Sequence, residues 1–319
     1  MKNPTTNTDQ TISTSHPDNA MLTTDFIAFL CSHEEACRRN GQFGLANNIR
    51  YSQSSVMHFH QGQSLRHIDT YWVESYTSWL AHNGVSSNSA ACYLRTLKSA
   101  YNRAVVAGIA PPYQPFSQSD TATKRTLKRA VGTEVIRRIA TADLTRLPAL
   151  DLARSLFIFS YCTRGMAFVD IAHLTTACVA DGYITYCRHK TGSRLHIRIL
   201  PVVQQIIDRY HTPGSPYLLP LLSDTDPATQ YTQYRTRLRY YNKQLHRLGA
   251  LLHLDTPLTS YTPRHSWASA AHRLDIPLAV IADALGHAST QTTLIYIASI
   301  DNHILDTANH TVVSASLLK

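Results

Sequence analysis

The chain has 319 residues, a length that predicts two domains, and hydrophobic residues make up 44% of it, enough for two cores. The formal net charge is +9 and the pI is about 9.3. This balance favours an acidic partner, with nucleic acid as the first candidate, although a generic basic protein would show it too. No apolar run reaches the roughly 18 residues of a membrane span, and the first residues lack a signal-peptide core, so we expect a cytoplasmic protein with no membrane partner.

The cysteines and histidines give no sign of a disulfide framework or a metal site. The six cysteines include no Cys-x-x-Cys pair and mostly lie in apolar runs, which indicates free thiols in a reducing compartment. The 17 histidines show no zinc-ligand spacing beside cysteines. We therefore expect no metal and no cofactor.

The N-terminal third predicts a small helical domain. Residues 1–20 are mostly Thr, Ser, Asn and Pro, which predicts a disordered lead-in. Apolar residues then recur at helical spacing through residues 21–110, which predicts a four-helix bundle. The helices are expected near 22–40, 45–60, from Ser64 to about 83, and 88–108. Trp72, Trp79 and Tyr101 fall on the apolar stripes, so we expect core positions and not base-stacking ones.

The polar faces of these helices are candidate DNA surfaces, although each residue could equally lie on an ordinary solvated face. The candidates are Asn47, Asn48, Arg50, Arg95, Lys98 and Arg103. Prolines then break the helical pattern, and residues 117–132 are polar and basic. We therefore expect residues 111–132 to be a linker, and a basic linker suits a chain that crosses a DNA backbone, although most charge runs are simply solvated. The basic residues of this linker are Lys124, Arg125, Lys128 and Arg129.

Residues 133–300 predict a second domain that carries the chemistry. Helices are expected near 133–142, 148–162, 201–211 and 230–248, and Arg164 follows the second of them. Residues 183–199 alternate as two strands around a tight turn that holds Lys190. On periodicity alone, Lys190 is an ordinary exposed hairpin lysine.

Three short motifs follow one another between residues 258 and 300. Arg264-His265-Ser266 comes first, then Leu285-Gly286-His287, and Tyr296 stands nine residues after His287. A tyrosine phenol can form a covalent ester with phosphate, although its pKa near ~10 makes it a weak nucleophile alone. An arginine fork can hold two phosphate oxygens by parallel bonds and keeps its charge. The set therefore predicts phosphoryl transfer without a metal ion.

These motifs resemble the C-terminal signature of the tyrosine recombinase (phage-integrase) family, and the resemblance extends over roughly residues 22–300. The chain is similar to the integrases and invertases of conjugative and invertible elements of gut anaerobes. The resemblance implies a mainly α fold with a small antiparallel β-sheet. It also implies a SAM-like core-binding domain at 21–110 and a catalytic domain at 133–300.

The same resemblance implies a role for each motif residue. Tyr296 would be the nucleophile that forms a 3′-phosphotyrosine, and Arg164 and Arg264 would clamp the scissile phosphate. Lys190 would protonate the 5′ oxygen, His287 would donate a hydrogen bond, and Asp170 would support the arginines. Where many members carry a histidine three residues before the second arginine, this chain has Tyr261. A hydroxyl contact is expected from Tyr261, and general-base catalysis is not.

The resemblance also implies partners. The DNA partner would be double-stranded DNA with specific recombination sites. The protein would be a monomer in solution and a homotetramer on synapsed DNA, and it would be associated with a bacterial nucleoid. Residues 301–319 form a tail with spaced apolar residues, expected either to dock on a neighbouring protomer or to fray. Two other functions remain open: a type IB topoisomerase, and a catalytically silent DNA-binding protein that keeps the fold.

Overall fold

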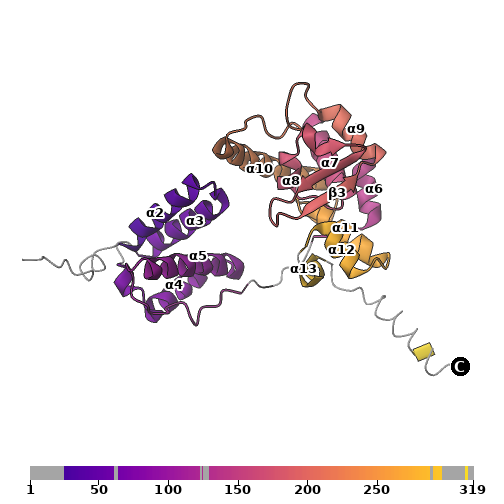
Figure 1. The fold of residues 1–319 in the computed structure, drawn as a ribbon. Coiled ribbons are helices and arrows are strands. Elements are labelled where there is room, and N and C mark those ends of the chain that lie inside the picture. The colour runs from indigo at the N-terminus through magenta and orange to yellow at the C-terminus, as the bar shows by residue number, and fades with distance from the viewer. Residues whose placement is uncertain are drawn as a thin grey trace, which may run out of the picture. The chain divides into compact units, whose positions relative to one another are not determined.

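The structure is a computed structural model, and it describes residues 25–60, 64–122, 124, 129–287, 290–296 and 313–314. The chain divides into two compact units, Met1–Lys124 and Arg125–Lys319 (Figure 1). The lead-in expected at 1–20 lies outside the described residues, as do Arg125, Lys128 and all of the 301–319 tail except 313–314.

Four α-helices form the described part of the N-terminal unit, as the apolar spacing predicts (Figure 1). They are α2 (Phe26–Arg39), α3 (Phe43–Phe59), α4 (Thr70–His82) and α5 (Ser87–Val106). Their apolar stripes meet in one core in which Trp72 and Tyr101 are buried, so the core prediction for these two rings is confirmed. Trp79 is half-buried and stacks on the Tyr76 ring, with 6.2 Å between centroids.

The third predicted helix begins later than expected. The Ser64 hydroxyl accepts a hydrogen bond from Arg66, but the helix that follows is only the 3₁₀ turn η1 (Leu65–His67). The chain is extended at Ile68 and Asp69, and the Asp69 carboxylate then caps α4 by accepting from the Trp72 backbone N at 2.7 Å. Ser64 and Asp69 are both good N-cap residues, so the sequence contains two start signals and the prediction merged them.

The predicted linker also begins too early. Phe116 is buried in the N-terminal core, and its ring lies 6.1 Å from that of Tyr101. The Tyr101 hydroxyl donates to the Pro111 carbonyl at 2.9 Å. The first part of segment 111–132 therefore packs on α5 and belongs to the N-terminal unit.

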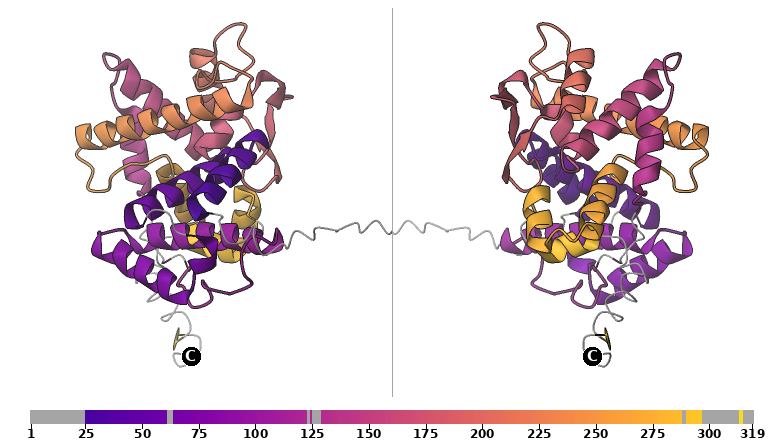
Figure 2. Two further views of the ribbon diagram at one scale, coloured as in Figure 1. Left: turned by 90° about the vertical axis from the view of Figure 1, so that its left-hand side faces the viewer. Right: turned by 90° about the vertical axis from the view of Figure 1, so that its right-hand side faces the viewer.

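The C-terminal unit is mainly helical with a small antiparallel sheet, and this confirms the predicted fold class (Figures 1 and 2). Its helices are α6 (Thr133–Thr141), α7 (Pro148–Cys162), α8 (Phe168–His173), η2 (Thr176–Cys178), α9 (Pro201–Tyr210), α10 (Pro227–Leu251), α11 (Thr262–Arg273), α12 (Leu278–Leu285) and α13 (Thr290–Tyr296). Its strands are β1 (Val179–Ala180), β2 (Tyr183–Cys187) and β3 (Arg194–Arg198), in the order β1-β2-β3. Cys187 pairs with Arg194, so the turn that holds Lys190 closes directly beyond this pair.

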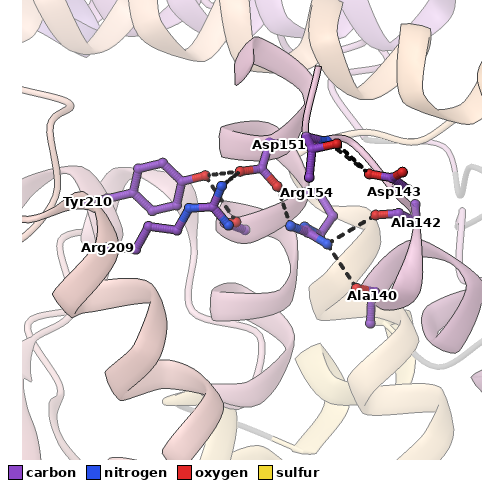
Figure 3. A network of polar contacts seen from close by, with 9 residues as sticks. Ala140, Ala142, Asp143, Asp151, Arg154, Arg209 and Tyr210 are labelled. Carbon is purple, nitrogen blue, oxygen red and sulfur yellow. Dashed lines mark hydrogen bonds and ion pairs between the residues drawn. The ribbon is translucent and has the colours of Figure 1, made fainter. Parts of the chain in front are cut away.

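Helix α7 is the centre of this unit, because α6, α9, α10 and α11 all pack on it. Its Asp151 carboxylate is buried and forms ion pairs with Arg154 and Arg209, and it accepts from the Tyr210 hydroxyl at 2.6 Å (Figure 3). Arg154 also donates to the Ala140 carbonyl at 3.0 Å. This network fixes α6 and α9 against the first half of α7.

None of the helices in the described part of the chain has both the length and the apolar character needed to cross a membrane. All six cysteines are described, and all are free.

Candidate active site

Arg264 is the side chain around which the motifs meet. It lies in the first turn of α11 and is only 2% exposed. Its Nη1 donates to the Gly165 carbonyl at 2.8 Å, and its Nη2 donates to the Leu285 carbonyl at 2.6 Å and contacts His287 Nε2 at 3.0 Å. One guanidinium therefore joins its own motif to two others, through Gly165 and Leu285, which are 99 and 21 residues away in sequence. These bonds fix the orientation of its planar fork.

Arg164 lies in the tight turn that ends α7. Its φ is +59° and that of Gly165 is +69°, a left-handed conformation that glycine adopts easily and arginine rarely. Two hydrogen bonds close the turn. The Thr163 hydroxyl donates to the Phe159 carbonyl at 2.7 Å, and the Gly165 N–H donates to the Ser160 carbonyl at 2.8 Å. Among the described residues, the side chain of half-buried Arg164 makes no hydrogen bond or ion pair. Its guanidinium is thus available to a phosphate beside Arg264.

His287 follows Gly286, whose left-handed φ of +63° ends α12. Because an arginine can only donate, His287 Nε2 accepts from Arg264, and the proton on Nδ1 is donated to the Thr293 hydroxyl at 2.9 Å. Burial first, and then the charges of nearby cations, lower the pKa of His287 to about 4. His287 is therefore neutral near pH 7, both of its ring nitrogens have partners within the chain, and the hydrogen bond to phosphate expected from it stays a prediction.

Lys190 lies exposed at the tip of the β2–β3 turn. The base of this turn is held by Asp170 in α8, whose Oδ1 accepts from the His189 backbone N at 2.8 Å. Asp170 is 4% exposed, and burial raises its pKa above the ordinary value. Asp170 also interacts electrostatically with Arg188 and Arg264, and its expected support of the catalytic arginines stays a prediction beside this bond to the lysine turn.

Tyr296 is the last residue of α13, the helix that carries Thr293. Its side chain lies outside the described residues, so its place relative to the arginines stays a prediction. Tyr261 stands at the N-cap of α11, three residues before Arg264, and is 43% exposed. Its position leaves the ring accessible from the side on which α11 begins.

Two family models match the chain. The model of the phage integrase SAM-like domain matches residues 25–119, which cover the N-terminal bundle. The model of the phage integrase family matches residues 171–303, which include the lysine turn, Arg264, His287 and Tyr296. The chain belongs to the phage integrase family of tyrosine recombinases. A comparison with curated proteins finds no match.

Solved structures with a similar fold include other integrases. A lambda integrase dimer bound to a COC′ core site has a TM-score of 0.65 and 16% identity, with 86% of this chain and 95% of that chain covered. A lambda integrase tetramer bound to a Holliday junction has a TM-score of 0.63 and 16% identity, with 89% and 81% covered. The Tn1549 transposon integrase in complex with a circular intermediate DNA has a TM-score of 0.61 and 13% identity, with 90% and 98% covered. At these identities the likeness shows the shared fold.

Most of the DNA-contact candidates in the N-terminal unit of the recombinase are accessible. Asn48, Arg50, Arg95 and Arg103 are exposed and Lys98 is half-buried, while Lys124 and Arg129 are exposed beyond the bundle. Asn47 differs, because it is 8% exposed and accepts a hydrogen bond from Arg38 at 3.4 Å. Its assignment to the exposed polar face was wrong, since position 47 lies beside the buried stripe of α3.

Sequence reasoning missed three residues of this recombinase site. Gly165 lies so close to Arg264 that a Cβ on it would be 2.7 Å from the Arg264 Cα. Thr293 is fully buried where it meets His287. Arg188 is 3% exposed and donates to the Gly286 carbonyl at 2.8 Å. A signal for Arg188 was present, because it continues the period-two alternation of the buried residues Ile184 and Tyr186.

Proposed function

We propose that this recombinase cleaves and rejoins DNA strands at specific sites through a 3′-phosphotyrosine intermediate formed by Tyr296. The observation that carries the proposal is the set of bonds made by Arg264. They hold the Arg164 turn, the end of α12 and the His287 ring around the Arg264 guanidinium. Helix α13 is joined to this group by the bond between Thr293 and His287. A cluster of fixed cations beside a helix that ends in tyrosine is suited to stabilising a phosphoryl group in transit.

The reaction forms one phosphate ester bond and breaks another. The Tyr296 oxygen attacks phosphorus while Arg164 and Arg264 hold the non-bridging oxygens, and the bond from phosphorus to the 5′ oxygen breaks. Lys190 gives its proton to the departing 5′ oxygen, which leaves as a hydroxyl. The strand is rejoined by the reverse steps, so the ester stores the bond energy and no nucleotide cofactor is consumed.

The proton of the attacking Tyr296 phenol must pass to an acceptor, and His287 is a poor acceptor. Its pKa of about 4 makes it a weak base, and its Nε2 already accepts from Arg264. Tyr261 occupies the position at which many related chains carry a histidine, and a phenol does not accept a proton at neutral pH. We therefore assign the phenol proton to solvent, and we assign a hydroxyl contact with phosphate to Tyr261.

We further propose that the recombinase acts as a tetramer on two paired DNA sites. The structurally similar lambda integrase tetramer on a Holliday junction supports this assembly. The basic residues of the N-terminal unit and of the segment around Lys124 would contact DNA phosphates. Whether strand exchange integrates, excises or inverts a segment then depends on how the two sites are arranged in the DNA.

A nicked suicide substrate tests the chemistry, because the strand end released by cleavage diffuses away and the covalent complex accumulates. The native chain should give a protein–DNA band that resists SDS, and Tyr296→Phe should bind the same DNA without forming the band. A band of undiminished intensity from Tyr296→Phe would show that another residue is the nucleophile. Relaxation of supercoiled plasmid without the recombination sites would favour a topoisomerase, and binding without any band from the native chain would favour a silent binder.

A further inference from the structure

Arg188 is a buried cation next to the active site, and no step proposed above uses it. It follows the last residue of β2 and is 3% exposed. Burying an arginine is unfavourable unless its donors are well satisfied. Among the described residues its Nε has no hydrogen-bond partner. An apolar side chain of similar length would fill the same space without that cost, so the guanidinium needs another explanation.

The contacts of Arg188 join the lysine turn to the loop of His287. Arg188 Nη1 donates to the Gly286 carbonyl at 2.8 Å, and the Thr191 hydroxyl approaches the same oxygen at 3.4 Å. Arg188 and Thr191 flank Lys190 by two residues and one residue. The lysine turn is thus attached on both sides of Lys190 to the residue that precedes His287.

The packing around Gly286 is equally close. A Cβ added to Gly286 would lie 3.3 Å from the Arg188 Cδ, so the stem of the arginine packs directly against the α12 end. The neighbouring carbonyl of Leu285 accepts from Arg264 at 2.6 Å. Two successive carbonyls at the end of α12 therefore hold two different arginines, and one of these arginines lies at the base of the lysine turn.

The turn is also fixed within itself and from α8. The Arg188 N–H donates to the Ser193 carbonyl at 2.8 Å, and the Gly192 N–H donates to the Arg188 carbonyl at 2.8 Å. Asp170 holds the next residue, His189, through its backbone N. Lys190 is left exposed at the tip of a turn whose base is fixed. If the attachment to Gly286 were lost, the base would remain closed and the direction of the tip would change.

We propose that Arg188 is a positioning residue that fastens the Lys190 turn to the Gly286 carbonyl, so that the lysine is aimed at the 5′ oxygen of the scissile phosphate. The inference rests on the proposed role of Lys190 as the general acid. It assigns to Arg188 an effect on leaving-group protonation and none on the attack by Tyr296. Displacing a catalytic group by about 1 Å can cost on the order of 100-fold in rate.

The test compares two suicide substrates in single-turnover cleavage, one with oxygen and one with sulfur at the 5′ bridging position. A thiolate leaves without a proton, so the sulfur substrate removes the need for a general acid. Arg188→Met removes the donors and keeps the length of the side chain, and it should cleave the oxygen substrate about 10- to 100-fold more slowly. It should cleave the sulfur substrate at close to the native rate. Arg188→Lys keeps one donor and should lie between Arg188→Met and the native chain.

Arg154→Met is the matched control. Arg154 is another largely buried arginine, and its bonds within the described residues go to the Ala140 and Ala142 carbonyls and the Asp151 carboxylate, none of which belongs to the catalytic motifs (Figure 3). It should lower the melting temperature of the protein and leave the cleavage rates on both substrates unchanged below that temperature. If Arg188→Met does not fold, the ratio of the two rates for Arg188→Lys, which retains the charge, decides the question.

A double variant separates positioning from general damage. If Arg188 acts through Lys190, then adding Arg188→Met to Lys190→Ala should slow the oxygen substrate little further, because the lysine is already absent. Multiplied effects, or a failure of sulfur to rescue Arg188→Met while it rescues Lys190→Ala, would overturn the inference and leave the proposed function intact. If sulfur does not rescue Lys190→Ala, the lysine is not the general acid, and the inference falls with that premise.

Discussion

Replacing Gly165 with alanine should disturb both stability and catalysis, because two separate restrictions meet at this residue. Its φ of +69° is a conformation that costs an alanine roughly 1–2 kcal/mol. A Cβ would also lie 2.7 Å from the Arg264 Cα and 2.9 Å from its Cβ. These are atoms of the α11 backbone and the root of its side chain, so no rotamer change relieves the overlap. Overpacking of this kind costs about 1–3 kcal/mol.

Gly214→Ala separates the two contributions. Gly214 has a φ of +80°, but a Cβ there would meet nothing within 4 Å. Both variants bear the conformational cost and both gain a little from a stiffer unfolded chain. The free energy of unfolding of Gly165→Ala should therefore fall below that of Gly214→Ala by about 1–3 kcal/mol, the overpacking contribution alone. For a unit of this size, each kcal/mol lowers the melting temperature by roughly 2–4 °C.

Catalysis gives the second measurement. The overlap must move Arg264 or the Arg164 turn, and both carry the proposed phosphate contacts. Single-turnover cleavage by Gly165→Ala, measured well below its melting temperature, should be slower by on the order of 100-fold, while Gly214→Ala should cleave normally. Equal unfolding free energies of the two variants would refute the overlap argument. A destabilised Gly165→Ala that cleaves at the native rate would show that the contact does not set the arginine geometry.

Four further predictions follow from the site and the charge. Tyr261→Phe should weaken catalysis by about one neutral hydrogen bond, ~0.5–1.5 kcal/mol, and a loss as large as that of Arg264→Ala would give Tyr261 a central chemical role. The imidazole of His287 should titrate by NMR near pH 4. Because the histidine of the unfolded chain binds its proton at higher pH, near ~6.5, the free energy of unfolding should fall as the pH drops from about 6.5 to 4. An NMR titration midpoint near ~6.5 would contradict the burial argument. The logarithm of DNA affinity should fall with the logarithm of salt concentration with a slope of about −0.9 per neutralised phosphate, and a flat dependence would argue against phosphate contacts. Deleting 301–319 should leave binding to a single site nearly intact and weaken assembly of paired sites, whereas undiminished recombination would assign the tail no role.

The helices and the family could be predicted because their signals are local. Apolar residues at helical spacing predict α5 and α7 within one or two residues, since a helix buries one stripe whatever lies opposite. The motif around Arg264 was recognisable because short runs of polar residues carry the chemistry. The burial of Asn47 was not predictable in this way, because its partner Arg38 comes from the preceding helix.

The parts of the site that sequence reasoning missed depend on contacts between distant segments. Gly165 needs to be a glycine because Arg264, 99 residues later, packs against it. The protonation state of His287 depends on which partners face its two nitrogens, and these come from α11 and α13. The burial of Arg188 could be predicted, since alternation along β2 places its side chain inward. Its role could not be predicted, because that depends on the Gly286 carbonyl, which comes from a distant segment.

The buried arginines are held mainly through neutral oxygens, and this has a consequence for the energy of the folded chain. The carbonyls of Gly165, Leu285 and Gly286 fix the guanidinium groups of Arg264 and Arg188 without cancelling their charge. Buried Asp170 interacts electrostatically with both arginines, but burial raises its pKa, so it offsets their charge only in part, and the proposed phosphodiester would supply further counter-charge. By thermodynamic linkage, whatever binds the folded state alone also stabilises it. The proposed DNA substrate would therefore be, in energetic terms, a component of the folded catalytic unit, and the stability of that unit should rise with the concentration of DNA that carries the recombination site.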